Sequence, residues 1–369
     1  MKKFLASAAV VAIATPAFAG IGIDSRYDYY SATSNSTTSS TTNSLSGFAF
    51  DRLIITGSGK ATDNVSVKAA INPLAINTTG NATDSNNNNS TKAAGVAPSV
   101  AGVLVGNNPL YGPTDIIYYA QAEVKVSDYF TLNAGKLFDI GLSGFEGQEN
   151  PGDMYFTSQA FMGATYLTGA SGVCKFADNQ TAGIAAVNNN SSNDSTRMGA
   201  GAWYVGTFGN FGVRADYYSL PGLIKAGGTA TTATPMTVGV SYKMDDWKFA
   251  LDYDMTSTQN GSINNTNQTL NSIVGSAKYA MGNWTPSLKL EQTSRQGYET
   301  AGSDVTDSLM NWSLAAEYKK NAADPFRYEI AYVNAATTYA NKAAYSINNA
   351  TVTGQYAYLG IRYMGDFLK

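Results

Sequence analysis

The chain has 369 residues, contains no histidine and carries a single cysteine, Cys174. These counts exclude a Ser-His-Asp triad, a Cys-His nucleophile pair, a histidine-ligated metal site and an intramolecular disulfide. Charged residues make up 14% of the chain, against roughly 25% in typical soluble domains, and the net charge is −3. The hydrophobic fraction is 44%, which is enough to build a core. The composition therefore fits neither a disordered chain nor an ordinary cytosolic enzyme.

The first twenty residues, MKKFLASAAVVAIATPAFAG, have the pattern of a secretory signal peptide. Two lysines precede a short apolar run, a proline breaks the run, and the Ala-Phe-Ala sequence that ends at Ala19 is a small-x-small cleavage site. We expect residues 1–19 to be removed and residues 20–369 to form one domain. An uncleaved membrane anchor is the alternative, but the apolar run is short for a spanning helix. Loss of two lysines lowers the net charge to −5, which argues against nucleic-acid binding.

Alternation of apolar and polar residues predicts β-strands along the rest of the chain. The segment 246–257, DWKFALDYDMTS, alternates over its whole length, and so does 235–244 before it. The sequence MDDW between them predicts a tight turn and hence a hairpin. The same pattern predicts sixteen strands, at 21–31, 46–57, 64–74, 114–126, 129–140, 164–177, 180–188, 196–208, 210–220, 235–244, 246–257, 268–281, 284–295, 308–320, 325–338 and 351–366.

The connections between these strands alternate between short and long. No apolar run approaches the roughly 18 residues of a transmembrane helix, and the alternation of loop lengths is typical of a transmembrane β-barrel with periplasmic turns and extracellular loops. Low-complexity runs such as TSNSTTSSTTNS are expected in mobile loop tips. The longer loops are expected at 32–45, 75–113, 141–163, 189–195, 221–234, 258–267, 296–307 and 339–350.

Aromatic and charged residues follow the same layout. Trp247, Trp284, Tyr129 and Phe211 come directly after short turns, while another set lies toward the opposite strand ends; two such bands are typical of barrel girdles. A barrel of sixteen strands is too wide for side chains to fill, so an aqueous channel should remain. The alternation directs charges of both signs to its lumen: Asp24, Arg26, Asp28, Arg52, Lys68, Glu123, Lys125, Arg214, Asp216, Lys243, Asp252, Asp254, Lys278, Lys289, Glu291, Arg295, Glu317, Lys319, Arg327, Glu329 and Arg362.

One loop differs from the others in composition. The segment 141–163, GLSGFEGQENPGDMYFTSQAFMG, lacks Asn/Ser/Thr runs and holds four aromatic residues. It also carries three acids, Glu146, Glu149 and Asp153. Apolar anchors of this kind predict that the loop packs inside the barrel, and packing over the barrel mouth is the alternative.

In layout and in two segments the chain resembles the Gram-negative general diffusion porins, which are sixteen-stranded trimeric barrels. The segments are FTLNAGKLFDIG (130–141) and AFDRLIITGSG (49–59). The resemblance implies a homotrimer in the bacterial outer membrane, in which loop 75–113 reaches the neighbouring subunit. It also implies that loop 141–163 folds into the lumen, and that its acids face bases on the wall. These residues are Glu146, Glu149 and Asp153 on the loop, and Arg26, Arg52 and Lys136 on the wall.

Two details refine this picture. Lys136 shares the parity of outward-facing residues, so a bulge near Gly135 is needed to turn it inward, and the alternation adds Arg214 as a further wall base. The chain ends in Phe367-Leu368-Lys369, whereas members of the family usually end on an aromatic residue.

The sequence therefore predicts an outer-membrane porin for passive diffusion of small hydrophilic solutes and ions, narrowed by the loop 141–163. Its partners are these solutes and outer-membrane lipid, and no catalytic residue, cofactor or metal is expected. A substrate-selective porin is an alternative in which inward tyrosines guide a sugar. A non-channel surface or structural protein is another, and an enzyme is disfavoured by the lack of histidine. The inward tyrosines are Tyr119, Tyr218, Tyr356 and Tyr358.

Overall fold

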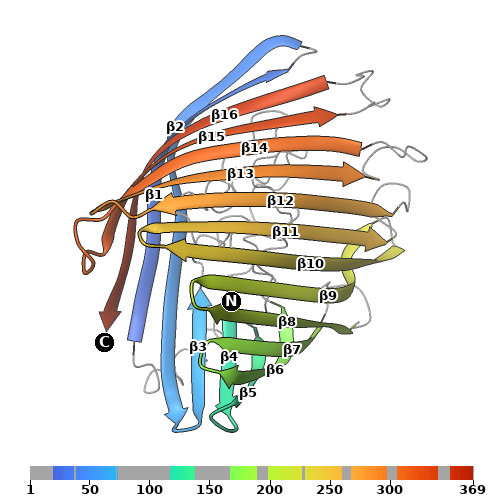
Figure 1. Cartoon of the computed structure of the whole chain (residues 1–369), viewed down its shortest axis with the longest axis vertical. Coiled ribbons are helices and arrows are strands. Elements are labelled where there is room, and N and C mark those ends of the chain that lie inside the picture. Colours follow the sequence, from blue (N-terminus) through green and yellow to red (C-terminus); the bar gives the residue numbers. More distant parts are fainter. Residues whose placement is uncertain are drawn as a thin grey trace, which may run out of the picture.

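The chain forms one closed, all-antiparallel β-barrel, in which each strand pairs with its neighbours in sequence and the last pairs with the first (Figure 1). The computed structural model describes residues 20–36, 39–71, 73, 117–137, 167–188, 198–226, 229–259, 267–296, 306–339 and 350–368. The strands in these ranges are β1 (Gly20–Ser36), β2 (Ser39–Thr62), β3 (Val65–Ile71), β4 (Ile117–Lys125), β5 (Phe130–Lys136), β6 (Thr168–Ala177), β7 (Gln180–Asn188), β8 (Met198–Phe208), β9 (Phe211–Ala226), β10 (Thr229–Met244), β11 (Trp247–Gln259), β12 (Gln268–Tyr279), β13 (Trp284–Gln296), β14 (Thr306–Tyr318), β15 (Phe326–Tyr339) and β16 (Ala350–Leu368).

The prediction of a sixteen-stranded up-and-down barrel is confirmed. Each predicted strand has a counterpart in the structure, and the bounds of β7 are those expected. Within the described ranges, no helix is long and apolar enough to cross a membrane. The predicted signal peptide and the loops 75–113 and 141–163 lie outside the described residues.

Two of the expected long loops are wrong. The segments 32–45 and 221–234 are largely strand: Ser36 pairs with Ser39 at the end of the β1–β2 hairpin, and Ala226 pairs with Thr229 at the end of β9–β10. The extensions of β1, β2 and β10 are rich in Ser and Thr, and that of β9 begins with Pro221 and Gly222, which usually signal a loop, so none of them shows the apolar alternation by which a strand is recognised. Threonine nevertheless suits the pleated backbone.

The short turns are made by residues that tolerate a left-handed backbone. Gly209 and Gly282 each have φ of 60°, and Asp245 has φ of 51°. Glycine pays no Cβ penalty in this region, and aspartate is among the residues that enter it more readily than most. These three tight connections fix the register of their hairpins and lie at the same end of the barrel.

The barrel has two chemically different faces. On β11 the side chains of Leu251 and Tyr253 are 51% and 38% exposed, while those of Asp252 and Asp254 between them are 1% and 0% exposed. Successive residues of a strand point to opposite faces, so the apolar set lies outside and the charged set faces the lumen. The same alternation occurs on most other strands. It gives the fold an apolar exterior and a polar, charged interior.

Aromatic rings form a band on the outer face near the short turns. The ring centroids lie 4.7 Å apart in the pair Trp247–Tyr279 and 5.0 Å apart in Trp284–Tyr318. The pair Phe211–Tyr242 lies at 4.6 Å. Toward the long-loop end, Tyr27, Tyr29, Tyr217 and Tyr253 are also exposed. The two aromatic bands expected from the sequence are therefore present on the exterior.

Candidate functional site

Four arginines stand in one row across four adjacent strands. Arg327 of β15 pairs with Arg362 of β16, Arg362 pairs with Arg26 of β1, and Arg26 pairs with Arg52 of β2. A β-bulge follows at once, because Tyr27 pairs with Phe50 and the chain skips one residue of β2. We call these four positions the arginine row. Like charges directly opposite one another repel, so the row requires nearby anions.

Carboxylates on the same wall supply those anions. Arg362 donates two hydrogen bonds to Asp24, from Nε at 2.8 Å and from Nη2 at 2.9 Å. Arg327 donates through Nη1 to both oxygens of Glu317, at 3.3 and 3.1 Å. The Arg362–Asp24 pair is bidentate, with two N–H groups on two oxygens, which is the geometry of the stronger ion pairs in proteins. The two pairs join β1 to β16 and β14 to β15.

Arg26 lies at the centre of this network. It is 1% exposed, its Nε lies 2.9 Å from Asp28 Oδ2, and its Nη1 lies 3.9 Å from Glu329 Oε2. Asp28 and Glu329 stand on either side of Gly360 in the register of β1, β16 and β15. Asp28 lies on the same strand as Arg26, and because Gly360 has no side chain the guanidinium can also reach across β16 to Glu329. The network thus spans the seam where the first and last strands close the barrel.

A second charged patch lies on β9, β10 and β11. In one row Arg214, Gly239 and Asp252 are cross-strand neighbours; in the next row Asp216, Thr237 and Asp254 are. Asp216 interacts electrostatically with Arg214, Asp252 and Asp254. All four charged side chains are buried. We call these six positions the acidic patch, because it gathers three carboxylates around one guanidinium.

The neighbouring strands continue this polar wall. The two oxygens of Glu291 accept hydrogen bonds from Ser272 at 2.7 Å, Thr293 at 2.6 Å and Asn311 at 2.9 Å, which satisfies the buried carboxylate. Nearer the short turns, three lysines of β10, β11 and β12 stand in register. These are Lys243, Lys248 and Lys278. In the described ranges, no His, Cys, Asp and Glu side chains are grouped closely enough to hold a metal ion.

Of the wall bases predicted from the sequence, the structure brings two together. Arg26 and Arg52 are cross-strand neighbours, whereas Lys136 lies on β5 and Arg214 on β9. The loop acids Glu146, Glu149 and Asp153 lie outside the described residues. Arg327 and Arg362 belong to the arginine row but were not singled out as wall bases, because their alignment depends on cross-strand register.

The expected bulge at Gly135 is wrong. The register of β5 with β4 and with β6 runs through this residue without a shift, although Gly135 has φ of 124°. Lys136 keeps the parity of the exposed Leu132, and its Nζ donates a hydrogen bond to the carbonyl of Ile117 at 2.6 Å. The glycine is needed because a Cβ there would overlap the carbonyl oxygen of Ala120.

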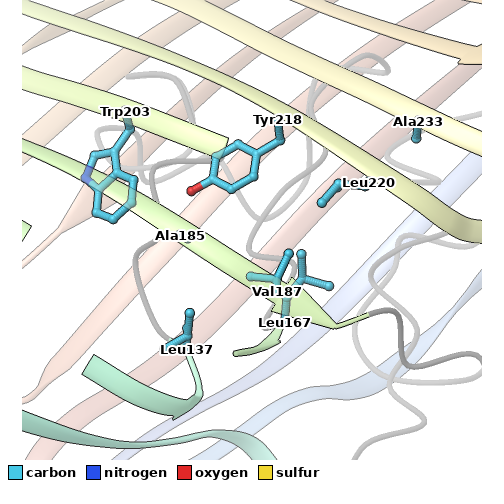
Figure 2. Close-up of a cluster of buried hydrophobic side chains, with 8 residues drawn as sticks. All are labelled: Leu137, Leu167, Ala185, Val187, Trp203, Tyr218, Leu220 and Ala233. Carbon is cyan, nitrogen blue, oxygen red and sulfur yellow. The ribbon is translucent and has the colours of Figure 1, made fainter. Parts of the chain in front are cut away.

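An apolar cluster covers part of the lumenal face near the long-loop ends of β5 to β10. Figure 2 shows its eight side chains on neighbouring strands. They share the face opposite the exposed Ile184, Met198 and Tyr217, and so point inward. The rings of Trp203 and Tyr218 lie over facing glycines, where an added Cβ would overlap them. The members, which we call the lumenal apolar cluster, are Leu137, Leu167, Ala185, Val187, Trp203, Tyr218, Leu220 and Ala233.

The inward tyrosines do not form one continuous strip. Tyr356 and Tyr358 stack on β16 with ring centroids 6.3 Å apart, while Tyr218 lies on β9 within the lumenal apolar cluster and Tyr119 lies on β4. These strands belong to three separate parts of the barrel wall.

No protein-family model matches the sequence, and no curated protein matches it. Several solved structures share the fold. The outer membrane channel DcaP of Acinetobacter baumannii has a TM-score of 0.58 at 11% identity, over 94% of this chain and 96% of that one. An anion-selective porin from Comamonas acidovorans has a TM-score of 0.58 at 11% identity, over 94% and 98%. Salmonella typhi OmpF, in complex with daunomycin, has a TM-score of 0.56 at 14% identity, over 93% and 97%.

Proposed function

We propose that this protein is an outer-membrane porin, a non-catalytic channel for passive diffusion of small hydrophilic solutes and ions. The observation that carries the proposal is the division of one closed barrel into an exposed apolar face and an inner face with charges of both signs. A lipid bilayer suits the first face, since an outward Arg or Lys at mid-depth would cost roughly 2–4 kcal/mol. Water suits the second. The shared fold with DcaP and two porins supports the same reading.

The finer parts of the proposal concern assembly and export. Cleavage after Ala19 would deliver the chain for insertion into the outer membrane, where the aromatic bands would lie at the two lipid–water interfaces. We propose a homotrimer, as the resemblance to general diffusion porins implies, with loop 75–113 reaching a neighbouring subunit.

The loop 141–163 is proposed to narrow the channel by packing on the lumenal apolar cluster. Leu137 and Leu167 support this, because they flank the segment that contains the loop and are themselves members of the cluster. Their backbones are joined by a hydrogen bond from the Leu137 N–H to the Leu167 carbonyl, at 2.9 Å. Both side chains are almost fully buried on a face that would otherwise meet channel water. The four aromatic side chains of the loop could pack on such an apolar surface.

Within the proposed constriction, Glu146, Glu149 and Asp153 would meet the positive side of the wall. Arg26 and Arg52, which are cross-strand neighbours in the arginine row, would form one side of a transverse field. Lys136 and Arg214 would contribute from other parts of the wall. A field of this kind favours dipolar solutes and sorts ions weakly by sign.

A planar bilayer tests the channel. Protein refolded in detergent and shown to be folded by its heat-modifiable gel mobility should give stepwise openings in KCl, grouped in threes if the trimer is correct. Folded protein that gives no openings would refute the proposal and favour a non-channel structural role.

The loop is tested separately. In the double variant Glu149→Gln/Asp153→Asn, the reversal potential in a KCl gradient should change in the direction of anion selectivity. An unchanged potential would show that the loop does not form the constriction. Val187→Asp should displace the loop from the cluster and raise the conductance, whereas Ala250→Asp, on the lumenal face of β11 outside the cluster, should not.

The sugar-selective alternative rests on the stacked pair Tyr356 and Tyr358, which lies beside Val333 and Ala331 on the lumenal face. A single pair is a short binding surface for a sugar ring, compared with a strip along the channel. Saturating block of the current by a sugar, abolished in Tyr356→Ala, would favour this alternative.

A further inference from the structure

A recess opens on the lumenal face near the short-turn end of the barrel, where β16 and the first four strands lie side by side. Its volume is about 380 Å³, and sites for small molecules commonly measure roughly 300–1,000 Å³. Asp366 lies four residues after Arg362 on β16 without a register shift between them, so both face the lumen. One cross-strand row runs through the recess, from Asp366 to Gly22, Thr56, Ala70 and Tyr119.

Two oxygen atoms converge above Gly22 in this row. A Cβ added to Gly22 would lie 2.7 Å from Thr56 Oγ1 and 3.2 Å from Asp366 Oδ1. The hydroxyl and the carboxylate come from the strands on either side of the glycine, and the space between them is open because glycine has no side chain. Both oxygens can accept hydrogen bonds, so an ammonium group suits this place.

The next row of the recess, nearer the short turn, carries the opposite charge. Gly20 pairs with Ser58, and Ser58 pairs with Lys68. The Lys68 side chain is 44% exposed, and its Nζ donates to Glu123 Oε1 at 2.9 Å, which uses one of the three N–H groups of the ammonium. The proposed cleavage after Ala19 would add the α-ammonium of Gly20 at the other end of the row. The Ser58 hydroxyl would then lie between two ammonium groups, a setting that suits a carboxylate.

We propose that this recess binds zwitterionic α-amino acids, with the ligand ammonium on Asp366 and Thr56 and the ligand carboxylate on Ser58 and Lys68. Neighbouring rows on one face of a strand are two residues, or roughly 7 Å, apart. An α-amino acid carries both charges on one carbon, and a hydrogen bond of about 2.9 Å at each end lets it reach both rows. The inference rests on the proposed channel function, because solutes reach the recess through the lumen, and it names a solute class for the channel.

The test compares the binding of L-alanine and of propionate, which lacks only the ammonium, to the folded mature protein in detergent by saturation-transfer NMR. Wild type should bind alanine about fivefold more tightly, because one pair of opposite charges about 4 Å apart in water is worth that factor. Asp366→Asn should abolish the preference by weakening the binding of alanine alone, whereas a purely structural role would weaken the binding of both solutes. The matched control Asp63→Asn, in the exposed turn between β2 and β3, should keep the preference.

Gly22→Ala tests the shape of the recess without changing a charge. The added methyl group would occupy the place of the ligand ammonium, so this variant should also lose the preference for alanine, and it decides the matter if Asp366→Asn does not fold. A wild-type channel that conducts but binds alanine and propionate equally would overturn the amino-acid site and leave the porin intact. Equal loss of the preference in Asp366→Asn and Asp63→Asn would do the same. Folded wild type without current would overturn the porin, while a preference for alanine that Asp366→Asn removes would still support the site.

Discussion

The two charged walls of this barrel contain the same residue types but differ in how acids and arginines are paired. On β14 to β1, the arginines are matched: Arg362 with Asp24, Arg327 with Glu317, and Arg26 with both Asp28 and Glu329. On β9 to β11, three carboxylates share the neighbourhood of Arg214. The first wall closes the seam between the first and last strands. The second lies within a run of consecutive hairpins, where no such closure is needed.

The difference teaches that charges on the inner face contribute unequally to the stability of the barrel. A matched, hydrogen-bonded ion pair is held in place by its partner, so it stabilises the barrel and offers little to a passing solute. Acids that stand close to one another repel, so the group on β9 to β11 should contribute less to the stability of the barrel. Exchanging acid for amide should therefore have opposite consequences on the two walls.

The largest effect is expected from Arg26→Met. This change leaves Asp28 and Glu329 buried without their common cation, and breaking a buried ion pair by removing one partner costs roughly 3–5 kcal/mol. Urea unfolding in detergent, followed by tryptophan fluorescence, measures it. The control Lys60→Met, on the exposed short-turn end of β2, should stay within about 0.5 kcal/mol of wild type. Equal stabilities for the two variants would mean that the seam network is not structural.

A sharper comparison is the same acid-to-amide change on each wall. Asp28→Asn should destabilise the barrel by roughly 1.5–3 kcal/mol, because it removes a charged partner of Arg26. Asp254→Asn should leave stability unchanged or raise it, because it relieves repulsion with Asp216. Unfolding in urea, measured as above, gives the stability of both variants. Destabilisation of similar size in both variants would show that the acidic patch is as well matched as the seam.

Glu291→Gln should have an intermediate effect. Glutamine replaces one of the two carboxylate oxygens by an NH2 group, which cannot accept a hydrogen bond. The variant therefore loses either the bonds from Ser272 and Thr293 or the bond from Asn311. Its free energy of unfolding in urea should fall by about 1–2 kcal/mol. The isosteric control Gln292→Glu lies on the exposed outer face of the same strand. Because Gln292→Glu puts a charge toward lipid, the loss of unfolding free energy that it causes should depend on the detergent or lipid used. The loss caused by Glu291→Gln should not.

The smallest effect is expected at the turn between β4 and β5. Lys125 donates a hydrogen bond to Asp128, and its charge and that bond lower the pKa of the Asp128 carboxyl. A lowered pKa in the folded state means that the pair stabilises the fold above the ordinary pKa of aspartate and loses this contribution as the pH falls. Because both side chains are exposed, Asp128→Asn should give no measurable change in unfolding at neutral pH. A clear loss of stability at neutral pH, absent at acidic pH, would contradict this.

The barrel was largely predictable from the sequence because lipid imposes a strict alternation. Each strand that faces lipid on one side and polar lumen on the other shows period two, as 246–257 does. The extensions of β1, β2, β9 and β10 escaped prediction because their sequences lack that alternation. Those of β1, β2 and β10 are runs of Ser and Thr, and that of β9 opens on Pro-Gly.

The site was less predictable, because it depends on register between strands distant in sequence. Arg362 lies 338 residues from its partner Asp24, and the bulge next to Arg26 shifts β2 by one residue. Alternation places each arginine on the lumenal face, but it cannot align four of them in one row. The positive φ of Gly135 likewise did not bring the bulge that the sequence suggested for Lys136.

The most direct test of the channel itself is liposome swelling. Vesicles that contain the folded protein should swell in a series of uncharged sugars at rates that fall steadily with sugar size and rise linearly with concentration, because a passive, water-filled lumen distinguishes uncharged sugars mainly by their size. Swelling no faster than in protein-free vesicles would contradict an open lumen. Saturation at high concentration of one sugar would contradict passive diffusion and favour a selective site.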